Sequence, residues 1–303
     1  MKKWLLVIRA PFLFLAVVLA VLGAAIAWYD SQEYGTAFHL GYAFLAGFGL
    51  LLAHISVNVF NEYFDYSSGI DLKTRKTPFS GGSGALPSGL ITPKQALWLG
   101  IGTLVIIVPI GIYFTVVSGW QLLPLLLVAA ICIVLYSPIM LRMPGPEWVA
   151  GLGLGTLPIL GAYFVHTGEY NLPVVIASIP SGILVLNLLF LNEFPDVEAD
   201  ASARRGTLPI VIGKDRSGIV YSVLTVLVYL WIIGGVITAQ MPIFALLGLV
   251  TLPWAIKAIR GSRRHQDMSK LVPAMANNVL VVLLTQLFMA IGYILAGVSW
   301  QLI

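Results

Sequence analysis

The chain has 303 residues, of which 59% are hydrophobic and only 10% are charged, whereas a soluble protein carries charge on about 25% of its residues. This composition excludes a water-soluble globular domain, and the single cysteine, Cys132, excludes an intramolecular disulfide. The net charge of +4 is small, so only the positions of the basic residues are informative.

Several apolar runs approach the roughly 20 residues that cross a bilayer as a helix. None shows the alternation of a β-barrel strand, so helices are the only spanning structure that satisfies the backbone. The first run lacks a convincing cleavage site, and we expect it to be retained. The sequence predicts an all-α integral membrane protein, a single domain over residues 1–303, with about nine transmembrane helices in one bundle around a central cavity and with cap loops on the cytoplasmic side. The helices are expected at 10–29, 38–64, 95–117, 121–140, 148–166, 172–193, 218–239, 242–259 and 276–298.

The basic residues predict the orientation, because Lys and Arg near helix ends stay on the cytoplasmic side. With nine helices and a cytoplasmic N-terminus, all 17 basic residues fall on the inner side, and the outer loops carry only Asp30, Glu33 and Glu169. We therefore expect a multi-pass plasma-membrane protein whose C-terminus lies outside. The longest loops, 65–94, 194–217 and 260–275, are all cytoplasmic in this prediction.

The first acidic cluster, NEYFDYSSGID, follows the second apolar run. Asn61 and Asp65 are four residues apart and share one face of a helix. Ser67, Ser68 and Gly69 then offer a place for the helix to end. We therefore expect Asp71 in a loop beyond it.

The second cluster, NEFPDVEAD, follows the sixth apolar run. Asn192, Asp196 and Asp200 are spaced at i, i+4 and i+8, which predicts one stripe. Pro195 removes a hydrogen bond and crowds the preceding turn, so the helix is expected to be distorted there.

Acidic and amide oxygens without a soft ligand suit Mg²⁺, which commonly binds a few carboxylates together with substrate phosphates. Two such clusters beside basic loops indicate a diphosphate site, in which cations contact the remaining phosphate oxygens. Two other interpretations stay open. The clusters could be ordinary polar helix ends, or they could mark the ion pathway of a cation transporter or channel.

Both clusters and their surroundings resemble the UbiA superfamily of intramembrane prenyltransferases. NEYFDYSSGID resembles its first Asp-rich motif, and NEFPDVEAD with RRGTLPIVIG resembles the second motif and its tail. Five residues separate Asp65 from Asp71, which is similar to the branch that prenylates 1,4-dihydroxy-2-naphthoate for menaquinone. The stretches RKTPFSGGSGALPSGLITPKQA and YSPIMLRMPGPEWVAGLGLGTLPILGAYFVHTG resemble that branch too. The chain departs from the family at Glu62, where Asp is common, and at PGPEW, which weakens a role for Glu147.

This resemblance implies a Mg²⁺-dependent transfer of an isoprenyl chain from a diphosphate donor to an aromatic acceptor in the lipid membrane. It implies two Mg²⁺ ions and no nucleic-acid partner. It implies that Asn61, Asp65 and Asp71 hold one Mg²⁺ ion, and that Asn192, Asp196 and Asp200 hold the other. Asp65, Asp196, Arg142 and Tyr136 are the implied catalytic residues, with the Tyr136 ring facing the allylic cation. The cations assigned to diphosphate are Arg75, Lys76, Lys94 and Arg205. Other acceptors stay open: a 4-hydroxybenzoate-type quinone precursor, geranylgeranylglyceryl phosphate, haem or a chlorin.

Three further features have ordinary structural interpretations. GLGLG at 151–155 lies in an apolar run, and we expect Gly151 and Gly155 to allow close helix packing rather than dinucleotide binding. The GGSG at 81–84 would offer backbone N–H groups to a phosphate or acceptor, or form a flexible loop. His54 and His166 are expected to be hydrogen-bonded filling residues rather than bases.

Overall fold

The computed structural model describes residues 2–74 and 76–300, and the ordered elements within them are all helical. Eight helices in this part of the chain are long and apolar enough to cross a bilayer: Ala10–Tyr34, Leu40–Ser67, Pro93–Val117, Glu147–Thr167, Leu172–Ser202, Lys214–Ile237, Ile243–Ser262 and Met268–Ser299. A shorter apolar helix, Trp120–Leu135, takes the place of the remaining predicted span. The all-α membrane fold is therefore confirmed, with one span shorter than expected.

Several spans are built from more than one element. The long single helices are α3 (Leu40–Ser67), α4 (Pro93–Val117), α8 (Leu172–Asn192), α11 (Lys214–Ile237) and α13 (Met268–Trp300). The first span joins the turn η1 (Ala10–Leu13) to α2 (Phe14–Tyr34), after a short α1 (Lys2–Val7). The others combine η3 (Trp120–Leu122) with α5 (Leu123–Leu135), α6 (Glu147–Gly151) with η5 (Leu152–Thr156) and α7 (Leu157–Thr167), and η7 (Ile243–Thr251) with α12 (Leu252–Ser262).

The predicted helix 276–298 begins too late, because α13 starts at Met268. The predicted helix 121–140 ends too late, because α5 ends at Leu135. Pro138 has no N–H to continue the helix, and it disfavours helical backbone at the residue before it. The chain instead turns through 136–139 into η4 (Met140–Arg142). That turn brings Tyr136 to the end of α5.

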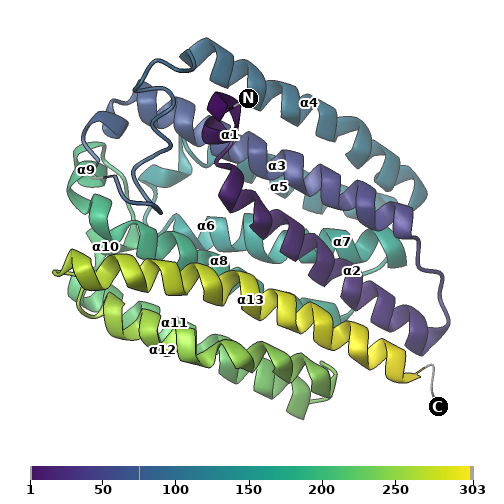
Figure 1. Cartoon of the computed structure of the whole chain (residues 1–303). Helices are drawn as coiled ribbons and strands as arrows, with labels where there is room; N and C mark the ends of the chain where they lie inside the picture. Colours follow the sequence, from purple (N-terminus) through teal and green to yellow (C-terminus); the bar gives the residue numbers. More distant parts are fainter. Residues whose placement is uncertain (1, 75, 301–303) are drawn as a thin grey trace.

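The helices lie side by side in a bundle (Figure 1). Helix α13 packs against α2, α8 and α12, while α3 packs against α2 and α4. The connection between α3 and α4 lies at the same end of the bundle as α9 (Val197–Ser202) and α10 (Leu208–Val211), and α13 ends at the opposite end (Figure 1). This arrangement agrees with the expected cap of long loops at one end. Which end faces the cytoplasm stays a prediction, as does the plasma membrane as location.

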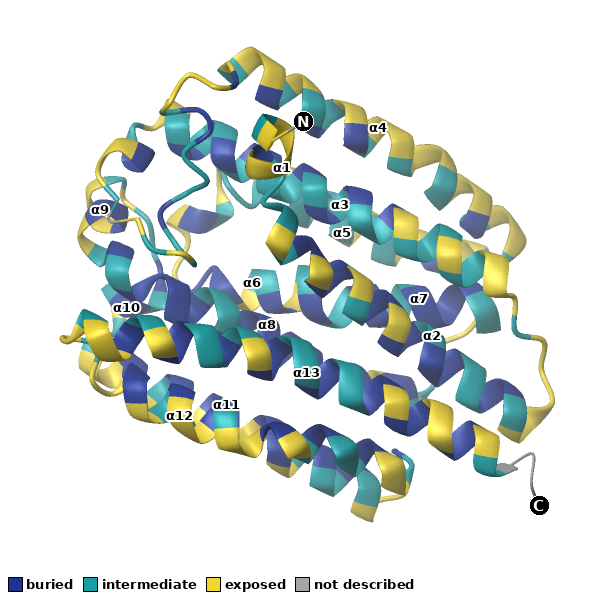
Figure 2. Ribbon diagram, in the orientation of Figure 1, coloured by how far each residue is buried: buried dark blue, intermediate teal, exposed yellow. Residues whose placement is uncertain are grey.

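The outer faces of the bundle carry apolar side chains. Val105, Ile112 and Val116 on α4 are 62%, 60% and 78% exposed, and Figure 2 shows long exposed stripes along α4 and α12. Exposed apolar surface on this scale suits lipid rather than water.

Two helices approach closely at the glycines of GLGLG, as the sequence predicts. A Cβ placed on Gly155 would lie 2.7 Å from Gly182 Cα in α8, and one on Gly151 would lie 2.6 Å from the Gly182 carbonyl oxygen. The intervening π-helix η5 lets both glycines meet the same neighbour. The backbones of α6–η5 and α8 therefore touch without intervening side chains.

We expect Gly155→Leu to destabilise the protein, because the added side chain must push two backbones apart, at a cost of about 1–3 kcal/mol or more. The matched control is Gly102→Leu, since a Cβ on Gly102 would meet nothing within 4 Å. Thermal unfolding in detergent should show a lower Tm for Gly155→Leu alone. Equal Tm values for the two variants would contradict the observed packing.

Candidate functional site

A cavity of about 770 Å³ lies inside the bundle, between α3, α4, α5, α7 and α8. All six residues that the sequence assigned to metal line it: Asn61, Asp65, Asp71, Asn192, Asp196 and Asp200. Two clusters about 130 residues apart in the sequence thus share one space, as the resemblance implied. Most of the remaining lining is apolar.

The first cluster is placed by the end of α3 and the turn that follows. Asn61 and Asp65 lie one helical turn apart near the last residue of α3, Ser67. Gly69 then adopts a left-handed conformation with φ 74°, which returns the chain into η2 (Ile70–Leu72) and brings Asp71 back to the cavity. Asp71 is therefore outside the helix, as expected.

The loop that contains GGSG covers this cluster. A Cβ on Gly82 would lie 2.7 Å from Asp71 Oδ1, and Gly82 has φ +72°. Only glycine allows the loop to approach the carboxylate so closely in this conformation. The loop is therefore part of the site.

The second cluster is distorted at Pro195, as predicted. Helix α8 ends at Asn192, a 3₁₀ turn (η6, Phe194–Asp196) contains Pro195, and α9 then carries Asp200. The three polar residues are thus presented by three consecutive elements rather than by one regular stripe. They still line the same cavity.

Arg205 joins the two clusters. Its Nη1 donates to Asp200 Oδ1 at 3.0 Å, and its Nη2 donates to Asp65 Oδ1. Burial opposes its positive charge, but the carboxylates of Asp65 and Asp200 outweigh that effect and hold the pKa of Arg205 above its usual value. A single guanidinium therefore holds together two acids from opposite sides of the cavity.

The oxygen atoms that remain fit a hard cation. Asp71 Oδ2, Asn192 Oδ1 and Asp196 Oδ1 are buried and have no hydrogen-bond partner among the described residues. Burial, followed by the charges of Asp65 and Glu62, raises the pKa of Asp71 to about 7. Such unpartnered oxygens are costly unless a cation or another donor meets them. In the described part of the chain, however, no three acidic, His or Cys side chains form a ready metal-binding group by themselves.

The other predicted residues are placed differently. Tyr136 lines the cavity, and its hydroxyl has no partner among the described residues. Arg142 and Lys94 are exposed and do not line the cavity. Lys76 is also exposed, with its amine beside Gly84, whereas Arg75 lies outside the described residues. Of the cations assigned to diphosphate, the structure brings Arg205 to the acids.

Sequence reasoning missed Arg9 and gave Glu62 no role. Glu62 is fully buried and accepts from Arg9 Nε at 2.7 Å, from Ser83 N at 2.7 Å and from Ser83 Oγ at 2.6 Å. It thereby fastens the glycine-rich loop to α3. A carboxylate inside an apolar helix, with no partner on that helix, was the signal that a distant cation had to meet it.

Glu147 also has a clear position. It is fully buried, and its Oε1 accepts from the backbone N–H of Leu208 at 2.6 Å. It therefore anchors the start of α10 beside the second cluster. This contact gives Glu147 a structural role that the unusual PGPEW turn did not suggest.

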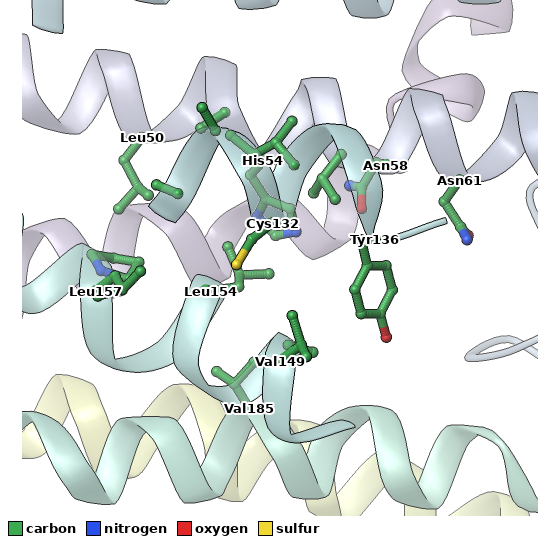
Figure 3. Close-up of a pocket in the computed structure, with 18 of the residues that line it drawn as sticks. Leu50, His54, Asn58, Asn61, Cys132, Tyr136, Val149, Leu154, Leu157 and Val185 are labelled. Atoms are coloured by element: carbon green, nitrogen blue, oxygen red, sulfur yellow. The ribbon is translucent and has the colours of Figure 1, made fainter. Parts of the chain in front are cut away.

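The two histidines are not the hydrogen-bonded filling residues that we expected. Nδ1 of His54 and both ring nitrogens of His166 are buried without a partner among the described residues. His166 stacks on Phe38 with ring centroids 4.4 Å apart. His54 instead lines the cavity, on the same face of α3 as Asn58 and Asn61 (Figure 3).

The family follows from comparison with known proteins. The UbiA prenyltransferase family matches residues 16–284. The chain belongs to this family. It is accordingly a multi-pass membrane prenyltransferase, which favours group transfer over cation transport as the use of the acidic cavity.

Curated UbiA relatives cover most of the chain at modest identity. A 1,4-dihydroxy-2-naphthoate octaprenyltransferase of Bacillus subtilis (strain 168) is 26% identical and covers 82% of this chain and 80% of its own. A 2-carboxy-1,4-naphthoquinone phytyltransferase of Synechocystis sp. is 25% identical, and the match covers 99% of this chain and 94% of that protein. A digeranylgeranylglyceryl phosphate synthase of Thermococcus kodakarensis is 29% identical, and the match covers 74% of this chain and 75% of that protein.

Solved UbiA structures share the fold. The apo structure of a UbiA homolog from Aeropyrum pernix K1 has a TM-score of 0.68 at 16% identity, covering 97% of this chain and 98% of its own. A UbiA homolog from Archaeoglobus fulgidus bound to GPP and Mg²⁺ has a TM-score of 0.60 at 13% identity, covering 99% and 100%.

We expect Arg205→Gln to destabilise the metal-free protein, because it leaves two buried carboxylates without their shared cation, which costs about 3–5 kcal/mol for a buried pair. The neighbouring Arg204→Gln is the control, since Arg204 is exposed. Thermal unfolding in EDTA should separate the two variants. A Tm for Arg205→Gln equal to that of Arg204→Gln would show that the bridge contributes nothing.

Proposed function

We propose that this UbiA-family enzyme transfers an isoprenyl chain from a polyprenyl diphosphate to 1,4-dihydroxy-2-naphthoate, with Mg²⁺, at the cytoplasmic side of the plasma membrane. The observation that carries the proposal is the division of the cavity. Its cap end gathers carboxylate and amide oxygens with Arg205, and the rest is walled by apolar side chains. An isoprenyl diphosphate donor is divided in the same way, into a charged diphosphate head and an apolar hydrocarbon tail.

The metal proposal is supported by the unpartnered oxygens of both clusters and by the Mg²⁺ and GPP bound to the Archaeoglobus homolog. Asn61, Asp65 and Asp71 would hold one ion, and the second set, Asn192, Asp196 and Asp200, would hold another. Bound Mg²⁺ would neutralise the diphosphate and stabilise the charge that develops as it leaves. Arg205 would then share its two carboxylates with the metal site.

Side chains of the protein bind and orient the donor in this proposal. The acidic end fixes the diphosphate, and the apolar walls of α4 and α5 hold the tail, which places the C1–O bond between them. Arg205, beside the leaving oxygens, favours the charge that develops there. The Tyr136 ring, at the boundary of the two regions, can face the positive allylic carbon.

The acceptor is supported by the naphthoate prenyltransferase among the relatives and by the five residues between Asp65 and Asp71. That interval lets the chain turn at Gly69 and brings Asp71 under the glycine-rich loop. The same loop is therefore in position to shape an acceptor pocket. The relative that makes digeranylgeranylglyceryl phosphate supports a lipid glycerol as the second candidate acceptor.

We expect Asp65→Ala and Asp196→Ala each to lower kcat by about 100-fold or more, because each removes a charge that holds the metal against diphosphate. Asp65→Asn should fail nearly as badly, since it keeps shape and loses charge. The assay is Mg²⁺-dependent diphosphate release from geranylgeranyl diphosphate with acceptor present. Glu33→Ala, an exposed position at the other end of the bundle, serves as the control. Near-normal turnover of either alanine variant at saturating Mg²⁺ would exclude the two-cluster site.

We expect 1,4-dihydroxy-2-naphthoate to be prenylated faster than 4-hydroxybenzoate or geranylgeranylglyceryl phosphate. The measurement compares the three acceptors side by side with one labelled isoprenyl diphosphate. Turnover of either alternative with none of the naphthoate would overturn the acceptor assignment and leave prenyl transfer intact. Haem and chlorin acceptors can be tested in the same series.

A further inference from the structure

Arg9 and His54 line the cavity and have no part in the mechanism above. We propose that they form the acceptor-binding pair, in which Arg9 binds the carboxylate of an aromatic hydroxy acid and His54 binds its distal hydroxyl. This inference rests on the proposed function and names the residues that select the acceptor.

Arg9 presents unused donors to the cavity. Its Nε donates to Glu62 at 2.7 Å, and no other hydrogen bond engages its guanidinium among the described residues. The side chain is 23% exposed and lines the cavity. Two terminal nitrogens of a guanidinium form the planar fork that matches a carboxylate.

The backbone around Arg9 is held in an unusual conformation. Arg9 has φ 51° and ψ 53°, the left-handed region that residues other than glycine rarely occupy. Asn58 Nδ2 donates to the carbonyl oxygen of Ile8 at 3.1 Å, which ties this strained turn to α3. Strain that the surroundings maintain is typical of functional positions. In this strained conformation the Arg9 guanidinium lies at the cavity.

The partner of Arg9 decides which anion suits it. Glu62 is fully buried and forms an ion pair with Arg9. A guanidinium in that state is better suited to hydrogen-bond one carboxylate than to balance a multiply charged diphosphate. One acid of each metal cluster, Asp65 in the first and Asp200 in the second, already pairs with another cation, Arg205. Arg9 is therefore assigned to the acceptor.

His54 supplies a matching polar group further along the same wall. It is only 3% exposed, and its Nδ1 has no partner among the described residues. A buried polar atom without a partner requires an explanation, and a ligand is one. A neutral imidazole offers one donor and one acceptor, which complements a phenolic hydroxyl.

Arg9 and His54 lie along one wall of the cavity. His54 and Glu62, the residue that holds Arg9, are eight positions apart on α3, a rise of about 12 Å. Figure 3 shows His54, Asn58 and Asn61 in order along this helix, facing Cys132 and Tyr136. In 1,4-dihydroxy-2-naphthoate the carboxylate and the distal hydroxyl stand on one ring, meta to each other, so the side chains of Arg9 and His54 must converge on that ring to meet both groups. A simple hydrocarbon tail would meet neither with a polar atom.

The test pairs enzyme variants with acceptors that lack one group. Isothermal titration calorimetry under anaerobic conditions measures the Kd of 1,4-dihydroxy-2-naphthoate, of 1,4-dihydroxynaphthalene, which lacks the carboxylate, and of 1-hydroxy-2-naphthoate, which lacks the distal hydroxyl. For the wild-type enzyme, removal of the carboxylate should weaken binding by about 10- to 100-fold, as expected for a charged hydrogen bond. Arg9→Gln should weaken naphthoate binding by a similar factor and should no longer distinguish it from the decarboxylated compound.

His54→Phe should weaken naphthoate binding by about threefold to tenfold, the smaller factor expected for a neutral hydrogen bond. It should no longer distinguish the naphthoate from 1-hydroxy-2-naphthoate, which lacks the distal hydroxyl. Arg216→Gln and His39→Gln are the matched controls, because both residues are exposed and away from the cavity. Both controls should keep wild-type discrimination among the three ligands.

The design separates binding from folding. Each conclusion compares two ligands on the same variant, so a reduced folded fraction cancels, and Arg9→Lys keeps a cation opposite Glu62 if Arg9→Gln does not fold. Equal weakening of all three ligands by Arg9→Gln, or by Arg9→Lys in its place, would overturn the inference. Weaker isoprenyl diphosphate binding with unchanged acceptor discrimination would overturn it too. A wild-type enzyme that neither binds nor prenylates the naphthoate would instead refute the proposed function.

Discussion

The structure depends on the balance of charge inside a low-dielectric cavity. Five acidic side chains line the cavity, and a sixth, Glu62, lies beside them. The five are Asp65, Asp71, Glu193, Asp196 and Asp200. All six are buried, and an ionised carboxylate in such a place is costly unless it is paired. Two arginines from distant segments provide the protein's own counter-charge. Arg205 draws the two metal clusters together, and Glu62, which accepts from both Arg9 and Ser83, holds the start of the chain and the glycine-rich loop against α3. The ends of the helices, the loop and the cavity are therefore parts of one electrostatic arrangement.

That arrangement explains why the polar residues of the cavity gather at helix ends. The helices supply the apolar walls, and the polar side chains lie where α3 and α8 end. Gly69 and Pro195 end those helices at the right residues, the first through a left-handed turn and the second by removing a backbone donor. Because both helices end at these points, their polar residues form one cluster that neither helix could form alone.

Much of this was predictable from the sequence, because it rests on local rules. Apolar length gave the spans, the i, i+4 spacing of Asn61 and Asp65 gave one polar face, and Gly151 with Gly155 indicated close packing. What the sequence alone could not provide were long-range partners. Glu62 and Arg9 are 53 residues apart, and nothing local to either residue identifies the other. The assignment of Arg142 and Lys94 to the site shows a second limit. A basic residue near a helix end is equally compatible with the cavity and with the surface, and both residues lie on the surface.

The short span Trp120–Leu135 has a consequence for the surrounding membrane. At 1.5 Å per residue its 16 residues extend about 24 Å, less than the roughly 30 Å of a hydrocarbon core. Trp120, 69% exposed, marks one end of this span, and α5 forms a wall of the cavity. Lipids beside that wall must compress to meet it. A bilayer that thins beside α5 would shorten the path of a lipid-borne molecule from the leaflet to the cavity that α5 lines.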